Sequence, residues 1–387
     1  MRGLLRATVH EAREHNERLV LATIYDGGQI SRAEVARTTG LTRTTVSDVV
    51  DGLQRAELVA TIGRGPSTGG KAPILLSVPD RARLLVGVDL GDRVFSAAVV
   101  TLRGKIIHRV ALPAENTDGE DSVKLALDVI GKVVGAADGR LLGIGIAAPG
   151  LIDTTDGTVI QGVTRSWRQL PLGSLVADRF SLPVYVANDS QAAALGEHVF
   201  GSVRPLNLVV IKVGVGISAG LILNGQLFSG DGFGAGEIGH TVVDPSAERC
   251  RCGRWGCLET FASTGAILAR SSELLGRPIT FDEAVAEFER GNTVVRSVVH
   301  DAATVLGAAV GGLIGLLHVR RIVLAGPMAV FGDPWLAAIQ TAARARALGA
   351  LADDTVFTIS KMDDLVMLGA SALLMTHELG LQLRPSM

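Results

Sequence analysis

The chain has 387 residues, too many for one hydrophobic core, so we expect two or three domains. Its formal net charge of -2 comes from 37 Lys and Arg against 39 Asp and Glu. This balance excludes a surface that is basic throughout and confines any nucleic-acid contact to a local patch. A hydrophobic content of 47% with 47 glycines and only 4% aromatic residues is typical of an α/β protein. The polar first residues do not resemble a signal peptide, and the odd number of cysteines favours a reducing cytoplasm.

Residues 1–78 are expected to begin with two helices separated by a short turn. Apolar residues recur at helical spacing between Glu17 and Asp26, and Gly27 follows them directly. Ser31 with Glu34 three residues later has the pattern of a capping box, which predicts a short helix that ends near Thr38.

A third helix is predicted over Arg43–Arg55, with Gly40 in the turn before it and Thr42 as its N-cap. Two strands separated by a Gly-rich loop follow and predict a wing. Three helices, a turn and a wing indicate a winged helix-turn-helix domain that binds double-stranded DNA; the alternative is a three-helix protein-interaction module. Small hydroxyl donors and cations fit phosphates and base edges, and the candidate DNA contacts are Ser31, Thr42, Arg43, Thr44, Thr45, Ser47, Arg64 and Lys71.

Residues 79–387 contain an internal repeat. The segments that begin at Leu84 and at Leu206 both read as apolar strand, Gly turn, apolar strand and hairpin. We therefore expect two related α/β lobes, over 79–200 and 201–364, with a ligand cleft between them. The C-terminal helix near 365–387 is expected to complete the first lobe.

A buried strand ends at Asn188-Asp189 and passes into a predicted helix. Folds of the α/β class place reactive carboxylates at such strand ends. The alternative is that Asp189 serves only as a helix N-cap.

All three cysteines, Cys250, Cys252 and Cys257, lie within eight residues, and His240 precedes them by ten. One imidazole and three thiolates make a typical tetrahedral Zn²⁺ site, so we expect a structural zinc; the alternative is three reduced thiols in a loop. The longest apolar stretch, Ala302–Val319, is rich in Gly and Ala, which favours a buried helix over a membrane span.

Together these motifs resemble the ROK family of repressors, open reading frames and sugar kinases. The resemblance is carried by the winged helix, GIAAPG, the Asn188-Asp189 strand end, the Glu-x-Gly-His segment and the cysteine motif. It implies a duplicated actin-like sugar-kinase fold, related to ribonuclease H, behind the winged helix. It also implies metal ligands at His240, Cys250, Cys252 and Cys257, and sugar contacts at Asn188, Asp189, Glu237, His240 and Glu259.

The chain departs from the pattern of the family's kinases in the phosphate-binding turns. The Asp-x-Gly-Gly-Thr turn reads Asp89-Leu90-Gly91-Asp92-Arg93, which places a carboxylate where triphosphate would lie. The second turn, usually Gly-Thr-Gly-Ile-Gly-Gly, reads Gly214-Val215-Gly216-Ile217-Ser218-Ala219. The third Gly-rich run reads Ala325-Gly326-Pro327, and proline removes a backbone donor. On the sugar side, Thr164 stands where family members often carry Asn.

We therefore expect a sugar-responsive transcriptional repressor of carbohydrate genes that acts as a homodimer or homotetramer on an inverted repeat. A sugar or sugar phosphate would bind between the lobes. We expect no catalytic activity, with Asp189 as a vestigial base. The alternative is an ATP-dependent sugar kinase with an appended DNA-binding domain, because Asp89, Gly91 and Asp189 are intact.

Overall fold

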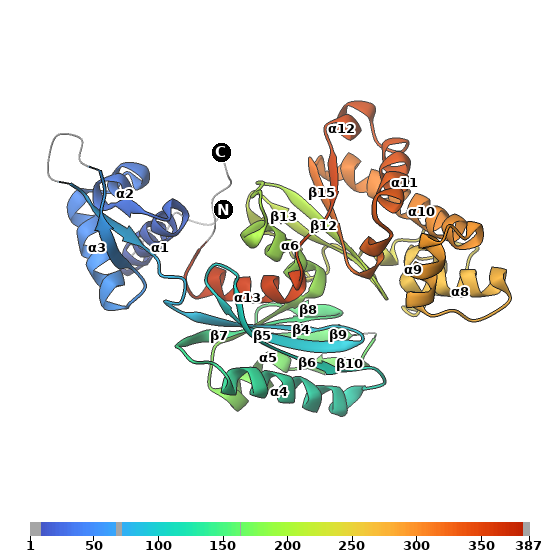
Figure 1. The fold of residues 1–387 in the computed structure, drawn as a ribbon, viewed down its shortest axis with the longest axis horizontal. Coiled ribbons are helices and arrows are strands. Elements are labelled where there is room, and N and C mark those ends of the chain that lie inside the picture. Colours follow the sequence, from blue (N-terminus) through green and yellow to red (C-terminus); the bar gives the residue numbers. More distant parts are fainter. Residues whose placement is uncertain (1–8, 67–71, 163, 382–387) are drawn as a thin grey trace.

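The computed structural model describes residues 9–66, 72–162 and 164–381. A winged-helix domain lies at one end of the molecule, beside the first of two α/β lobes (Figure 1). Two central helices, α6 (Asp189–Phe200) and α13 (Leu365–His377), lie between the sheets of the two lobes. The expected two-lobe fold behind a winged helix is therefore confirmed, whereas the boundaries at residues 78 and 200 stay predictions.

The winged helix follows its local sequence signals closely. The Ser31 hydroxyl accepts a hydrogen bond from the Glu34 backbone, and the Glu34 carboxylate accepts one from the Ser31 backbone, which completes the predicted capping box. Gly40 ends the second helix with a φ of 73°, and Thr42 caps the third. The prediction was wrong for the first helix, which begins at Val9 instead of Glu17. The elements are α1 (Val9–Gly27), β1 (Ile30–Ser31), α2 (Arg32–Thr39), α3 (Arg43–Arg55), β2 (Ala60–Arg64) and β3 (Ile74–Ser77).

The first lobe is built on a five-stranded sheet in the order β11-β7-β4-β5-β6. Helices α4 and α5 pack on one face, and α13 packs on the other, so that the central strands are buried on both sides. A small sheet, β10-β9-β8, extends the lobe. The bounds are β4 (Leu84–Leu90), β5 (Val94–Thr101), β6 (Ile106–Pro113), α4 (Gly119–Gly135), β7 (Leu141–Ala148), β8 (Leu151–Asp153), β9 (Thr158–Gly162), β10 (Trp167–Leu170), α5 (Leu172–Phe180) and β11 (Val184–Asn188).

The second lobe repeats this arrangement with the order β14-β13-β12-β15-β16. In both lobes the first strand pairs antiparallel with the next strand and parallel with a later one, which confirms the internal repeat. The bounds are β12 (Leu208–Val213), β13 (Ile217–Leu223), β14 (Gln226–Leu227), η1 (Ile238–His240), α7 (Glu259–Ala262), α8 (Thr264–Leu275), α9 (Phe281–Glu289), α10 (Thr293–Leu317), β15 (Arg321–Ala325), η2 (Pro327–Phe331), α11 (Gly332–Arg344), α12 (Gly349–Asp353) and β16 (Val356–Ile359).

Helix α10 contains most of the apolar stretch noted in the sequence. Within the part of the chain that the structure describes, it is the one helix long and apolar enough to cross a membrane. Half of that stretch is buried, and the helix packs against α11, α8 and α9. This placement agrees with the expected buried helix.

Several polar contacts join the winged helix to the first lobe, and those of Tyr25 and Asp26 lie at the end of α1. The Tyr25 hydroxyl donates to the Leu102 carbonyl at 2.6 Å, and the Arg103 guanidinium lies 3.8 Å from the centre of the Tyr25 ring. Asp26 forms an ion pair at 3.0 Å with Arg204, in the loop that follows α6. The end of α1 is therefore tied both to the first sheet and to the end of α6.

The central helices approach each other so closely that glycine is required. A Cβ atom on Gly369 of α13 would lie 1.7 Å from the Ala192 carbonyl oxygen of α6, and one on Gly145 of β7 would lie 1.9 Å from the Ala370 carbonyl oxygen. Contacts this short cannot be relieved by rotating a side chain, because both partners are backbone atoms. The spacing of the two lobes therefore depends on these glycines.

Gly369→Ala is expected to lower the free energy of unfolding by about 1–3 kcal/mol or more, because the added methyl group forces α6 and α13 apart. Gly312→Ala is the matched control, since its Cβ in α10 would meet nothing within 4 Å. That change should be neutral or should stabilise the protein by about 0.5–1 kcal/mol. Urea unfolding of both variants measures the difference, and equal midpoints would contradict the close approach.

Candidate functional site

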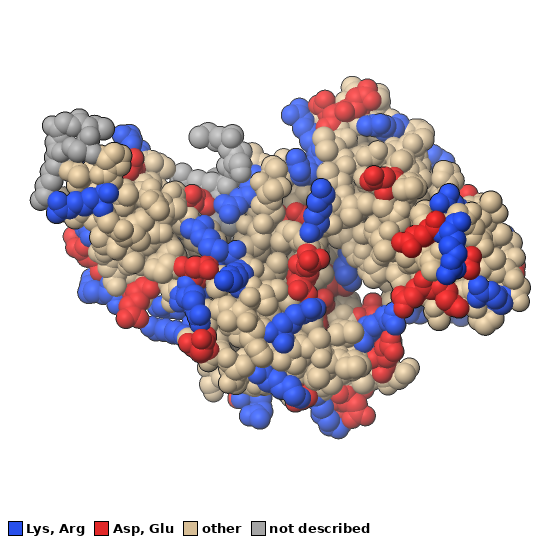
Figure 2. Space-filling view, in the orientation of Figure 1, with Lys and Arg blue, Asp and Glu red and all other residues tan. Residues whose placement is uncertain are grey.

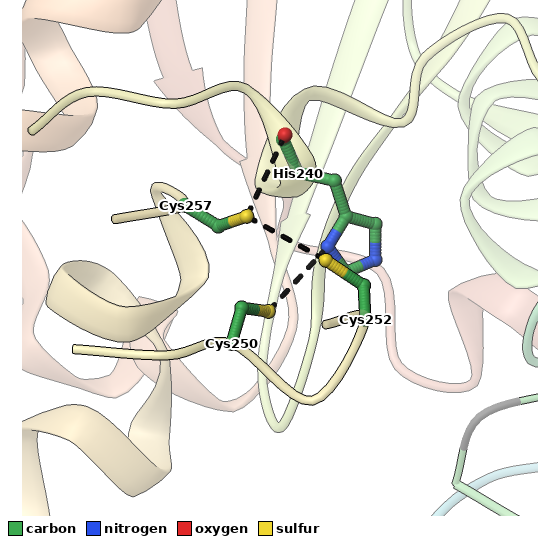
Figure 3. Close-up of side chains that lie close together, drawn as sticks. All are labelled: His240, Cys250, Cys252 and Cys257. Atoms are coloured by element: carbon green, nitrogen blue, oxygen red, sulfur yellow. Dashed lines mark hydrogen bonds between the residues drawn. The ribbon is translucent and has the colours of Figure 1, made fainter. Parts of the chain in front are cut away.

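The cysteine loop and His240 converge on one point in the second lobe. Cys250, Cys252 and Cys257 lie in the loop before α7, while His240 ends the short helix η1. Their ligand atoms all lie within 4.8 Å of one another (Figure 3). The isolated β-bridges Val242–Cys257 and Arg249–Trp255 hold the loop in this position.

The spacing of these atoms fits a tetrahedral metal. The Cys250 Sγ lies 3.7 Å from the His240 Nδ1, and the Cys252 and Cys257 sulfurs lie 3.6 Å apart. Zn–S bonds of about 2.3 Å at tetrahedral angles place two sulfurs about 3.8 Å apart. Burial raises the pKa of the Cys257 thiol to about 12, so a divalent cation would have to displace its proton. The residue set therefore fits a structural metal ion.

A cavity of about 430 Å³ lies beside this cluster, between the lobes, and is named the small cavity. Its walls come from the end of β11, from the start of α6, from β13, from η1 and from the cysteine loop. The structure brings into this one cavity all five positions expected to contact a sugar: Asn188, Asp189, Glu237, His240 and Glu259.

Asn188 and Asp189 have separate tasks at the start of α6. The Asn188 side chain accepts a hydrogen bond from the Ser190 backbone and donates one to the Gly150 carbonyl at 2.9 Å. Asn188 is thus the N-cap, and the alternative role of Asp189 as that cap is wrong. The Asp189 carboxylate instead accepts a hydrogen bond from the Lys212 ammonium of β12 at 2.6 Å.

The carboxyl groups of this region are strongly affected by burial. Burial raises the pKa of Glu237 to about 7, and the charges of Asp189 and Glu259 add to the rise. Burial also raises the pKa of Asp89 to about 7, although the Lys212 charge opposes it. Burial lowers the pKa of Lys212, but the carboxylates of Asp189 and Asp89 outweigh it and the net pKa is raised. Lys212 therefore stays charged and neutralises part of the acidic cluster.

A large cavity of about 1280 Å³ adjoins the small one, and Asp92, Lys212, Arg251 and Glu259 line both. It contains the altered phosphate turns, including Gly91 and Asp92, Gly214 and Val215, and Gly326 and Pro327. Six carboxyl groups line this cavity, those of Asp89, Asp92, Glu248, Glu259, Asp282 and Asp364, against the four cations of Arg93, Lys212, Arg249 and Arg251. The wall is therefore acidic on balance, which weakens the binding of a triphosphate.

Sequence reasoning missed two residues of this site. Lys212 is the single charged residue in the otherwise apolar strand β12, and a lysine in a buried strand requires a partner, so this signal was present. Arg165 is only 3% exposed, and its guanidinium donates to the carbonyls of Gly91, Asp92 and Ala114. These are non-local contacts that no local pattern shows.

The candidate DNA contacts do not all share one surface. Thr42, Arg43 and Thr44 are exposed at the start of α3, Thr45 and Ser47 are half-buried, and Arg64 is exposed on the wing. Ser31 is 4% exposed and its hydroxyl contacts Glu34, which leaves it a capping residue without access to DNA. Lys71 lies outside the described residues. Figure 2 shows acidic and basic side chains interspersed over the visible face, in keeping with the near-neutral net charge.

Comparisons with known proteins agree with this architecture. Residues 85–377 match the ROK family, and residues 14–67 match the MarR family. The chain is 32% identical to the xylose repressor of Caldicellulosiruptor bescii, over 94% of this chain and 96% of that protein.

Two solved structures resemble the fold. A ROK family transcriptional regulator, homologous to the E. coli MLC protein, has a TM-score of 0.84 and 26% identity, covering 96% of this chain and 98% of that one. A ROK family glucokinase from Streptomyces griseus, solved with glucose and AMPPNP, has a TM-score of 0.68 and 26% identity, covering 75% and 98%. The chain therefore belongs to the ROK family, as a member that carries an N-terminal winged helix.

Proposed function

We propose that this protein is a cytoplasmic, sugar-responsive transcriptional repressor of carbohydrate uptake or catabolism genes. One observation carries the proposal: a winged helix and the small cavity occur in one chain whose whole length resembles a repressor. A sugar bound between the lobes would change their relative angle, and the winged helices of a homodimer or homotetramer would then lose or gain operator spacing.

The alternative function, an ATP-dependent sugar kinase, is supported by the glucokinase fold and by intact Asp89 and Asp189. Two observations oppose it. A general base must take a proton, but Asp189 is held by the Lys212 ammonium at 2.6 Å. The large cavity, where nucleotide would bind, has six carboxyl groups in its wall against four cations. An assay of ATP consumption with a panel of hexoses distinguishes the two functions.

We propose that His240 and the three cysteines hold a structural Zn²⁺. The metal would join η1 to the loop before α7, and both segments contribute side chains to the small cavity. His240 would use Nδ1 for the metal, which leaves Nε2 for a ligand hydroxyl. The metal would supply rigidity to the cavity wall.

We propose that the start of α3 enters the DNA major groove. Arg43 and Thr44 are exposed there, at the positive end of the helix dipole. Arg32 donates to the Ser47 carbonyl and to Asp51 at 2.7 Å, which fixes α2 against α3. A two-fold oligomer would present two such helices to an inverted repeat.

The zinc proposal predicts about one Zn²⁺ per chain in protein purified without chelators. Cys257→Ser should lose the metal and lower the melting temperature, because η1 and the cysteine loop lose their cross-link. Ser246→Ala is the control, since its hydroxyl lies on the same loop but donates to the Asp244 carboxylate, which is not a metal ligand. Mass spectrometry measures the metal content of each protein. A wild type without zinc, together with a melting temperature that Cys257→Ser leaves unchanged, would contradict the metal site.

The DNA proposal predicts that Arg43→Ala weakens operator binding by about 1–3 kcal/mol, as the loss of a base contact does. Arg55→Ala at the other end of α3, about 18 Å away, is the matched control and should bind normally. Titrations would use a duplex that the wild type selects from a random pool. Equal affinities for the two variants would place the recognition surface elsewhere.

The sugar proposal predicts that Glu237→Gln lowers sugar affinity about ten- to a hundred-fold at pH 8, where the carboxylate is ionised, because a charge-assisted hydrogen bond is lost. DNA affinity without sugar should not change. Glu273→Gln, an exposed carboxylate on α8, is the control. Calorimetry and DNA titration on the same preparation measure both effects; unchanged sugar affinity in Glu237→Gln would refute the assignment.

A further inference from the structure

Two buried oxygen atoms at the small cavity have no hydrogen-bond partner among the described residues. They are the Asp92 Oδ1 and the Thr164 Oγ1, and both residues line the cavity. A buried polar atom without a partner is costly, and in a cavity wall a ligand can satisfy it. At both of these wall positions the chain also departs from the ROK kinase pattern.

The loops that carry these two residues are tied together by one buried side chain. The Arg165 guanidinium donates to the Gly91 carbonyl at 2.8 Å and also to the Asp92 carbonyl. Its second terminal nitrogen, Nη1, donates to the carbonyls of Ala114 and Thr117 at 2.7 and 2.8 Å. We call this set of Arg165 hydrogen bonds the Arg165 clamp. Because Thr164 directly precedes Arg165, the clamp holds both loops in place. The two oxygens are therefore held in position before any ligand binds.

Most of the Lys and Arg side chains that line the small cavity already interact with another residue. Lys212 contacts Asp189, and Arg251 lies 3.5 Å from Glu259 while it also donates to the Val215 carbonyl. Arg254, exposed on the cysteine loop, is the one lining Lys or Arg without an ion pair among the described residues. Against these three cations stand four carboxyl groups, of Asp92, Asp189, Glu237 and Glu259.

Asp92 lies at the opening between the two cavities, since it lines both. A phosphate on a ligand at this opening would lie beside Asp92 and face the large cavity, where Asp89 and Asp364 also lie. A free hydroxyl donates to a carboxylate, whereas a phosphate dianion is repelled by one.

We propose that Asp92 and Thr164 are specificity determinants that select an unphosphorylated sugar and exclude its phosphate ester. This inference rests on the proposed sugar-sensing function. The Asp92 carboxylate and the Thr164 hydroxyl accept hydrogen bonds from sugar hydroxyls, and the fixed charge of Asp92 opposes phosphate at the exit of the small cavity.

The test is calorimetry on the full chain with three pairs of probes: D-glucose and its 6-phosphate, N-acetyl-D-glucosamine and its 6-phosphate, and D-xylose and its 5-phosphate. In the wild type, at least one free sugar should bind about ten-fold or more tightly than its ester. Asp92→Gly should reduce this preference about ten-fold or more by removing the charge. Asp92→Asn, which keeps the shape and the fold, should reduce it in the same direction.

Two further variants make the test specific. Thr164→Val, of nearly equal volume, should weaken free-sugar binding about five- to ten-fold through loss of one hydrogen bond. Glu273→Gln removes a charge that lies outside both cavities and should leave the preference unchanged. Tight binding of an ester, or an unchanged preference in both Asp92 variants, would overturn the inference while sugar sensing stands. If no sugar and no ester binds the wild type, the proposed function itself fails.

Discussion

The ion pair between Lys212 and Asp189 is the contact on which the rest of the site depends. Lys212 lies on the first strand of the second lobe, and Asp189 begins the helix α6 that follows the first lobe's sheet. The two side chains are only 18% and 15% exposed, so each would be costly to bury without the other. This pair holds the two lobes in register at the small cavity and occupies the carboxylate that a kinase would use as its base. Under the proposed function, a sugar hydroxyl that competed for Asp189 would act directly on the contact between the lobes.

Helix α6 gives this competition a route to the DNA-binding domain. It spans twelve residues, about 18 Å, from the small cavity at Asp189 to Phe200. The loop beyond it carries Arg204, which pairs with Asp26 at the end of α1. Gly369 of α13 lies directly against the backbone of α6, so the two helices are closely packed along this length. A regulator requires an element that joins its ligand site to its DNA-binding domain, and α6 extends from one to the other. Sugar can act through α6 only if it binds more tightly to one arrangement of this helix than to another.

The features that the sequence predicted correctly depend on residues close together in the chain, whereas contacts between distant segments required the structure. Helix caps at Ser31 and Thr42 and the duplicated hairpins depend on residues a few positions apart, and they were predicted correctly. The cysteine cluster has the same local character. Helix α1 was predicted too short because its first turns are polar and show no apolar stripe. The clamp by Arg165 joins segments up to 74 residues apart and had no local signal. Asp92 was recognised as a negative charge in the wrong place for ATP, but its position between the two cavities required the fold.

The same fold serves kinases and repressors, so function must be read from the site. Catalysis requires groups that bind the transition state better than the substrate, whereas a switch requires only a ligand that prefers one arrangement of the lobes. Here the Asp189 carboxylate is paired with the Lys212 ammonium, and the first phosphate turn carries Asp92. Under the proposed function, both features disfavour phosphoryl transfer while they leave polar groups in the cavity for sugar hydroxyls. The unpartnered oxygens of Asp92 and Thr164 make the empty arrangement less favourable, and a sugar that satisfies them stabilises the arrangement in which it binds. Under the proposed function, the changes that disfavour phosphoryl transfer would thus also supply the differential binding free energy that a sensor needs.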